Sequence, residues 1–311
     1  TSGMELKSLS GKSGPPVVLR TAEFDTNAPI RPRIPFQQIS NEMPFFREAM
    51  LIGEKERQEL RVALMAGDNF AQAIIDRIYN DQYNLLLGAD AAVERMRKML
   101  LSTGFIQAVI DGVPMDYDYG FDVATQMTTL VGTATWNSPD TSDPVADLLA
   151  GRKDARLGNA RAILTEETYG YMIKSANVKG AMFPAALAPS YVLPSQIEQW
   201  LTEATKVSFT IISNDENTFR DRVNGPDMQM FPDGVVTLIP GSGAIGETPY
   251  GVTPEESDLM GGEEADVTVT AAGVAVVSKI HDHPVNQETR VSQIALPVIE
   301  RIDRMHIINV Y

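Results

Sequence analysis

The first 45 residues of the chain lack the apolar periodicity of a packed core. Short extended runs at residues 4–9 and 17–20 flank a flexible segment of glycine, serine and two consecutive prolines, and further prolines follow at positions 29, 32, 35 and 44. Prolines so closely spaced fit neither a helix nor an interior strand. A two-stranded ribbon alone is only marginally stable in water. We therefore expect residues 1–45 to form an extended arm that lies on another surface, which a second subunit can supply.

The longest amphipathic segment of the chain follows this arm. Its apolar residues recur mostly at intervals of three or four, at Phe70, Ile74, Ile78, Leu85, Ala89, Val93, Met96 and Leu100. This spacing predicts a helix over residues 69–102, about 50 Å long at a rise of ~1.5 Å per residue. Asn69 suits its N-cap and Gly104 its C-terminal stop. Helix formers at 54–66 predict a shorter helix before it.

Downstream of this helix the pattern changes period. Residues 105–110 and 113–120 predict two strands joined by a tight Asp-Gly turn. An α/β pattern follows, with helices expected from 143 to 157, from 165 and from a capping box at 195–198, and with strands at 161–164 and 207–212. The remainder predicts strands at 235–239, 267–270, 274–280, 291–299 and 305–310.

Composition excludes several classes of protein. The 311 residues contain no cysteine, which rules out disulfides, thiolate metal sites and a cysteine nucleophile. A net charge of −15 argues against a primary nucleic-acid binder, which needs a basic surface. Three histidines leave little room for imidazole catalysis. No apolar run approaches the ~18–20 residues of a membrane span.

A glycine-rich motif at residues 241–246 matches the dinucleotide-binding fingerprint and follows an expected strand. That fingerprint requires a helix directly after it, because the pyrophosphate sits on the helix N-terminus. Pro249 and Pro254 exclude such a helix, and Glu247 would repel a phosphate. We therefore expect a connecting loop and no cofactor.

Polar clusters offer only weak candidates for a catalytic or metal site. His281 and His283 share a face of an extended segment, but no third ligand group accompanies them, so a solvated turn is expected. His306 is expected to be half-buried in the last strand. The acidic residues of the 105–120 hairpin are expected on a solvated strand face, because no His, Lys or Arg converges on them. They are Asp111, Asp116, Asp118 and Asp122.

The order of these elements resembles that of the tailed-phage major capsid proteins of the lambda-like capsid protein E family. Residues 4–35 look like the family's E-loop, and residues 46–50 lead toward its spine helix, here 69–102. The family's strand, glycine turn and return strand ending in Asp-x-Gly are similar to 101–120. Its linker with a tryptophan followed by a helix is similar to Trp136 and residues 145–156, and its terminal strand to 304–311.

The resemblance implies an α+β chain with the Hong Kong 97-type capsid fold. Its parts would be an extended E-loop hairpin at 1–45, a peripheral domain at 46–140 with the spine helix and a β-sheet, and an α/β axial domain at 141–284. The strands of 285–311 would return to the peripheral domain. The E-loop residues expected to contact a neighbouring subunit are Leu6, Lys7, Leu9, Lys12, Val17, Leu19, Arg20, Arg31 and Arg33.

The resemblance also implies a function. The chain would be a structural, non-enzymatic subunit that assembles into the hexamers and pentamers of an icosahedral shell enclosing double-stranded DNA, first in the host cytoplasm and finally in the virion. Its partners would be other copies of itself, a decoration or cement protein, a portal, a scaffold or protease, and packaged DNA bound without sequence preference, but no membrane. Two alternatives remain open, an encapsulin-like cellular shell protein and a nucleotide-binding α/β enzyme.

Overall fold

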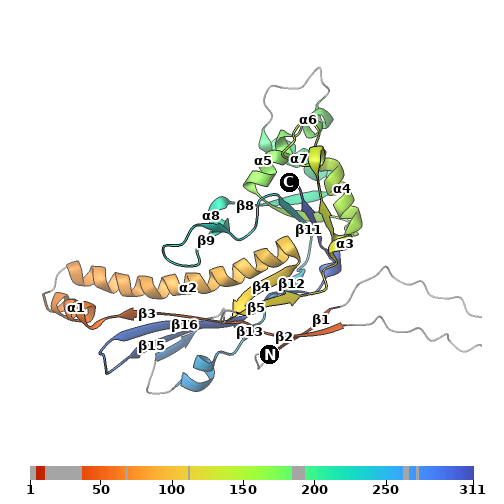
Figure 1. Ribbon diagram of the computed structural model, residues 1–311. Coiled ribbons are helices and arrows are strands. Elements are labelled where there is room, and N and C mark those ends of the chain that lie inside the picture. The colour runs from red at the N-terminus through yellow and green to blue at the C-terminus, as the bar shows by residue number, and fades with distance from the viewer. Residues whose placement is uncertain are drawn as a thin grey trace, which may run out of the picture.

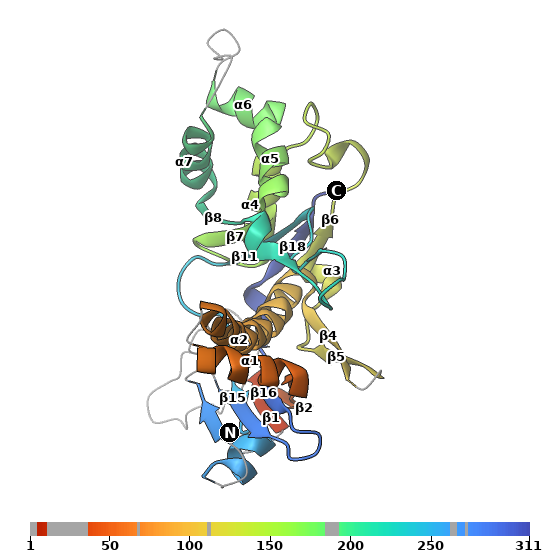
Figure 2. The same ribbon diagram turned by 90° about the vertical axis from the view of Figure 1, so that its left-hand side faces the viewer.

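The computed structural model describes residues 5–10, 37–66, 69–110, 113–183, 193–261, 266–270 and 273–311. The chain forms two limbs that meet at one end of a long helix (Figure 1). One limb consists of a long helix lying on an antiparallel sheet, and the other is an α/β unit that rises from the C-terminal end of that helix. Figure 2 shows the same limbs along the helix axis, with the sheet below the helix and the α/β unit above it.

Helix α2, Asn69–Thr103, is the 35-residue element that connects the two limbs. It confirms the predicted 69–102 helix to within one residue, and α1, Glu54–Ala66, confirms the shorter helix before it. The apolar stripe faces the protein from its middle onward, where Leu85, Val93 and Leu100 are each less than 5% exposed. Gly104, at φ +85°, ends the helix as predicted.

The sheet beneath α2 is antiparallel, with strand order β13-β16-β15-β14 and with β3 also paired to β16. Its strands are β3 Phe45–Ile52, β13 Tyr250–Gly251, β14 Asp266–Val269, β15 Val274–Ile280 and β16 Gln287–Ala295. Leu85 and Ala89 of α2 pack on Val274, Val276 and Val291. Residues 46–50, expected to lead toward the helix, form the middle of β3, which precedes α1 and α2. Every one of the eight positions of β3 finds a partner in β16.

The C-terminal strands differ from the predicted single strand at 291–299. Strand β16 begins earlier, at Gln287, and ends at Ala295. Pro297 interrupts the ladder because it has no N–H to donate. A separate short strand, β17 Val298–Ile299, follows and pairs with β12 Gly246–Glu247.

The N-terminal arm contains a two-stranded ribbon of β1, Glu5–Ser10, and β2, Gln37–Glu42. The ribbon lies within the arm expected at 1–45 and extends past the stretch 4–35 that resembles the E-loop. Residues 37–42 lie between Pro35 and Pro44 and contain no proline, so every one of them can donate to a ladder. The expected run at 17–20 lies outside the described residues. From β2 the chain passes through the buried Met43 directly into β3.

Strands β4, Phe105–Ile110, and β5, Val113–Asp118, form the predicted hairpin after α2. Tyr117 and Tyr119 are buried, and the Tyr119 hydroxyl donates to the Pro297 carbonyl over 2.7 Å. Asp116 and Asp118 alternate with them and are exposed, as expected, whereas Asp122 is half-buried as the N-cap of α3. Short elements follow, namely α3 Val123–Gln126, β6 Met127–Thr129 and the turn η1 Gly132–Ala134.

The α/β limb is built on a five-stranded sheet in the order β6-β18-β11-β7-β8. Its longer strands are β7 Ala160–Thr165, β8 Val207–Ile212, β11 Val235–Pro240 and β18 His306–Asn309. The helices of this limb are α4 Pro144–Asp154, α5 Glu166–Lys174, α6 Ala176–Met182 and α7 Pro194–Thr205. Buried Trp136, Leu148 and Leu201 belong to the core between helices and sheet.

Helix starts in this limb follow local chemistry. Asp143 caps α4 by accepting from the Ala146 N–H, with Pro144 in the first turn, as predicted. The capping box at 195–198 is wrong. Pro194 already occupies the first turn of α7 and Leu193 is the cap residue, so Ser195 lies inside the helix. A proline is favoured at a helix start because its missing N–H would be unpaired there.

The remaining elements are short. They are α8 Asn214–Asn217, β9 Thr218–Phe219, β10 Met228–Gln229, η2 Glu255–Leu259 and η3 Ile302–Arg304. The chain crosses between limbs more than once, because β14, β15 and β16 join the sheet under α2 and the later β18 joins the α/β sheet. The expected domain boundaries at 45, 140 and 284 stay a prediction.

Candidate assembly surface

The expected contact residues of the arm fall in two groups. Leu6, Lys7 and Leu9 lie in β1, where their register partners in β2 are Asn41, Ser40 and Gln38. The other expected residues lie outside the described part of the chain. They are Lys12, Val17, Leu19, Arg20, Arg31 and Arg33. Among the described strands β1 pairs with β2 alone, and the ribbon projects past the other described elements (Figure 1).

A buried ion cluster, here called the Glu255 clasp, lies on the sheet face opposite α2. It consists of Glu255, Arg47, Arg290 and Ser292. Glu255 is 2% exposed, and its Oε1 lies 2.8 Å from Arg47 and 3.7 Å from Arg290. The Ser292 hydroxyl donates to its Oε2 over 2.8 Å. Charges this deeply buried need such partners, and the clasp fixes η2 to β3 and β16.

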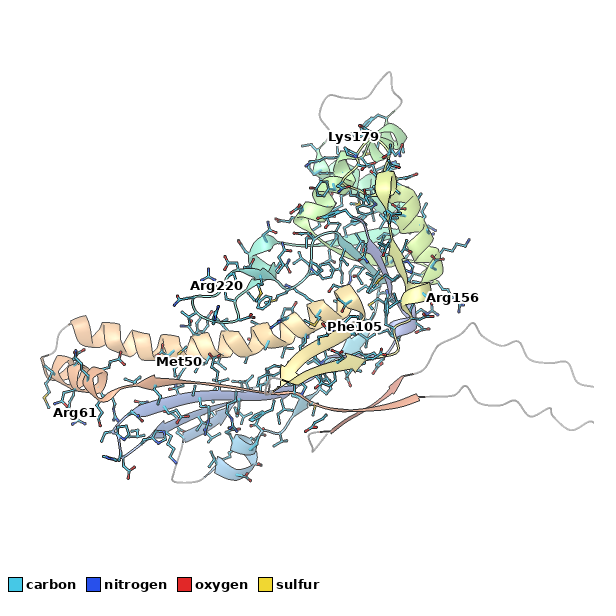
Figure 3. The ribbon with its side chains drawn as sticks, viewed as in Figure 1. Met50, Arg61, Phe105, Arg156, Lys179 and Arg220 are labelled. Atoms are coloured by element: carbon cyan, nitrogen blue, oxygen red, sulfur yellow. The ribbon has the colours of Figure 1, made fainter. Side chains whose placement is uncertain are left out.

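The C-terminal half of α2 is tied to the α/β limb by side chains. Lys98, 7% exposed, donates from Nζ to the Glu216 carbonyl over 2.6 Å. The Arg95 guanidinium lies 4.5 Å from the Phe219 ring centroid and 3.7 Å from Asp221. These partners belong to the loop around β9 that overhangs α2, where Arg220 is labelled (Figure 3). We infer that α2 acts as a stiff strut between the limbs.

Two cavities flank the contact between Leu101 of α2 and Ile163 of β7. One, of about 510 Å³, opens beside Ile211, Glu216 and Phe231. The other, of about 300 Å³, is here called the joint cavity and has both apolar walls and charged groups. Its lining is Arg97, Leu100, Leu101, Arg161, Ile163, Ile239, Ile245, Gly246, Glu247, Thr248, Pro297, Val298 and Ile299.

Large apolar side chains are exposed on both limbs. They include Leu51, Val62, Met65, Tyr83, Leu87, Val131, Val223, Val252, Met260 and Ile280. Among them Val223, Met65 and Val131 are at least 75% exposed. Exposed apolar side chains that cluster into one patch mark a surface that can contact another chain.

The glycine-rich segment 241–246 does not form a nucleotide site. Gly246 starts β12, and a Cβ on it would lie 1.9 Å from the Val298 carbonyl oxygen. The glycine is needed for backbone packing against β17. The segment is followed by a strand rather than by a helix, which removes the basis of the nucleotide-binding alternative.

Two of the three histidines have structural partners, and His283 is exposed. His281, directly after β15, has its Nε2 2.7 Å from Oε2 of Glu288 in β16. His306 was expected to be half-buried but is 1% exposed, because β18 is an interior strand of the α/β sheet. Its Nε2 lies 2.9 Å from Thr128 Oγ1, and burial lowers its pKa.

The described residues contain neither a metal-binding cluster nor a helix that could span a membrane. Across these residues, no three side chains of His, Asp or Glu gather in an arrangement that could hold a metal ion. None of the described helices is long and apolar enough to cross a membrane.

No protein-family model and no curated protein sequence matches the chain. A prophage capsid protein from E. coli CFT073 superposes with a TM-score of 0.60 at 13% identity, covering 89% of this chain and 80% of that one. A phage-related protein from Bordetella bronchiseptica RB50 gives a TM-score of 0.56 at 13% identity, covering 99% and 87%. The chain has the Hong Kong 97-type capsid fold.

This capsid fold confirms the predicted fold class. In its terms α2 is the spine helix and the β1–β2 ribbon corresponds to the expected E-loop hairpin. The SrpI encapsulin from Synechococcus elongatus PCC 7942 is also similar, with a TM-score of 0.47 at 9% identity, covering 99% of this chain and 82% of that one.

Proposed function

We propose that this chain is the structural subunit of an icosahedral phage head, in which hexamers and pentamers enclose double-stranded DNA. The observation that carries the proposal is the β1–β2 ribbon, which projects from the capsid fold and pairs with itself alone among the described strands. A two-stranded ribbon is only marginally stable by itself and becomes stable when it packs on another surface. A neighbouring copy can supply that surface.

The strut supports this function mechanically. Helix α2 is held along one face by the sheet and at its C-terminal end by Lys98 and Arg95. The ribbon is rooted in the same sheet through β3. A contact made by the ribbon on a neighbour is thus anchored to a rigid body. Repeated around a ring, such contacts add to the thousands of Å² that obligate interfaces bury.

The charge of the chain fits a container for DNA. At a net charge of −15 the subunit has little general attraction for phosphates. Packaged DNA would then be contacted weakly and without sequence preference, so that it can move during packaging. A scaffold or protease, a portal and a decoration protein would be the other partners.

The test is assembly of the purified protein. We expect light scattering to detect particles of head size and negative-stain microscopy to show closed shells. A compact monomer or dimer under all assembly conditions would overturn the proposal. Particles isolated from their native source then distinguish the two kinds of shell, because a phage head holds DNA and a portal whereas an encapsulin holds a cargo protein.

A further inference from the structure

The joint cavity has the features of a socket for one long apolar side chain. Its floor is made by Leu100, Ile239 and Val298, all less than 7% exposed. The cavity has a volume of about 300 Å³ and is open at its mouth, so a side chain from outside can enter it. Filling it with an apolar group would recover the dispersion contacts that its walls now lack.

The mouth of the joint cavity carries charges of both signs. Arg97 and Arg161 both line it and are exposed, as is one carboxylate, Glu247. Arg97 donates from Nε to Thr248 and lies 3.6 Å from Glu94. Arg161 has no ion-pair or hydrogen-bond partner for its side chain within the described residues. A segment with an exposed apolar side chain next to acidic side chains would complement this mouth.

The end of η2 offers such an occupant. Met260 is 60% exposed, and the exposed Asp258 and half-buried Glu256 precede it. Neither carboxylate has a side-chain partner within the described residues. Glu255 of the same segment is locked into the Glu255 clasp. The segment η2 that carries Met260 is therefore held in place before any contact forms. This reduces the entropy lost on binding.

One copy cannot fill its own joint cavity. The segment η2 contacts β14 and β15, on the sheet face away from α2. In Figure 1 it is the light-blue helix below the sheet, whereas β12, which lines the joint cavity, lies above the sheet. Met260 and the joint cavity thus lie on different faces of the protein.

We propose that Met260 of one copy inserts into the joint cavity of the next copy, with Asp258 and Glu256 facing Arg161 and Arg97. The contact rests on the proposed function, since it requires copies to assemble. The contact joins two different surfaces. Each copy presents Met260 to one neighbour and its joint cavity to the other. Head-to-tail contacts close into rings when the rotation between neighbouring copies closes and form filaments when it does not. A hexamer or pentamer needs the closed ring.

A cysteine pair tests the contact directly, because the chain has no cysteine of its own. The double variant Met260→Cys with Thr248→Cys is assembled, oxidised mildly and separated without reductant. We expect a ladder that extends to pentamers and hexamers. The matched control pairs Met260→Cys with Val131→Cys, a 75% exposed site on the other limb, and should give no ladder. Dimers alone would overturn the head-to-tail arrangement, and a failure to cross-link would overturn the contact.

A charge exchange tests the ionic part. We expect Asp258→Arg to lower the yield of assembled particles at least tenfold and Arg161→Asp to restore it in the double variant. Failure of the second change to restore assembly, or an unchanged yield in Asp258→Arg, would overturn the pairing. If the parent protein forms shells but these variants behave otherwise than expected, this contact is wrong and the shell function stands. If the parent never assembles, the proposed function itself fails.

Discussion

Arg47 of β3 and Glu255 of η2 form an ion pair of 2.8 Å although the two residues are far apart in the sequence. The carboxylate also accepts from Ser292 and lies near Arg290. Since the Glu255 side chain is 3% exposed, its charge depends on these partners. The pair holds the segment that carries Met260 on the outer face of the sheet.

Removing this carboxylate should loosen η2. We expect Glu255→Ala to lower the free energy of unfolding by about 2 kcal/mol, since Arg290 loses a buried partner while the 44% exposed Arg47 stays partly hydrated. Urea denaturation followed by circular dichroism measures the change. Glu256→Ala is the matched control and should stay within ~0.5 kcal/mol of the parent. Equal stability of the two variants would contradict the role of the clasp.

Two helical glycines should respond oppositely to the same substitution. A Cβ on Gly151 of α4 would lie 2.8 Å from Leu238 Cδ1 and 3.0 Å from His306 Cδ2, so Gly151→Ala should destabilise the protein by about 1–3 kcal/mol. A Cβ on Gly88 of α2 meets nothing within 4 Å. Gly88→Ala should therefore stabilise by roughly 0.5–1 kcal/mol, because alanine favours the helix. Thermal unfolding of both variants checks the sign, and a shift in the same direction would contradict the packing described for α4.

The sequence predicts the local elements well because they depend on local chemistry. The stripe from Leu85 to Leu100 has the helical period, and α2 ends within one residue of the expected position. Asp143 and Pro144 determine the start of α4 in the same way. Strand β3 was missed because its identity depends on pairing with β16, which follows more than two hundred residues later in the chain.

The assembly surface could be predicted only in part for the same reason. The proline pattern indicates an arm. It does not show that β1 pairs with residues 37–42, because these two segments are far apart in the sequence. The Glu255 clasp and the joint cavity combine residues from distant segments, and no local pattern marks Glu255 as buried.

Deleting residues 4–33 should separate folding from assembly. These residues include β1, which among the described strands pairs with β2 alone, so their loss leaves the sheet of β3, β15 and β16 intact. We expect the truncated protein to keep the cooperative unfolding and circular dichroism spectrum of a folded chain but to remain a monomer or a single capsomer by light scattering. Closed shells formed by the truncated protein would refute the role of the arm.

The buried His306 should make stability depend on pH. Burial lowers its pKa in the folded chain, whereas in the unfolded chain it takes up a proton near pH ~6.5. Below that pH the unfolded state therefore binds more protons, and the free energy of unfolding falls as the pH falls. His306→Gln keeps a polar group that can bond Thr128 Oγ1 but removes the titration. Urea unfolding between about pH 7.5 and pH 5.5 should give a flatter dependence on pH for the variant than for the parent. Parallel slopes in the two proteins would show that His306 is protonated equally in both states.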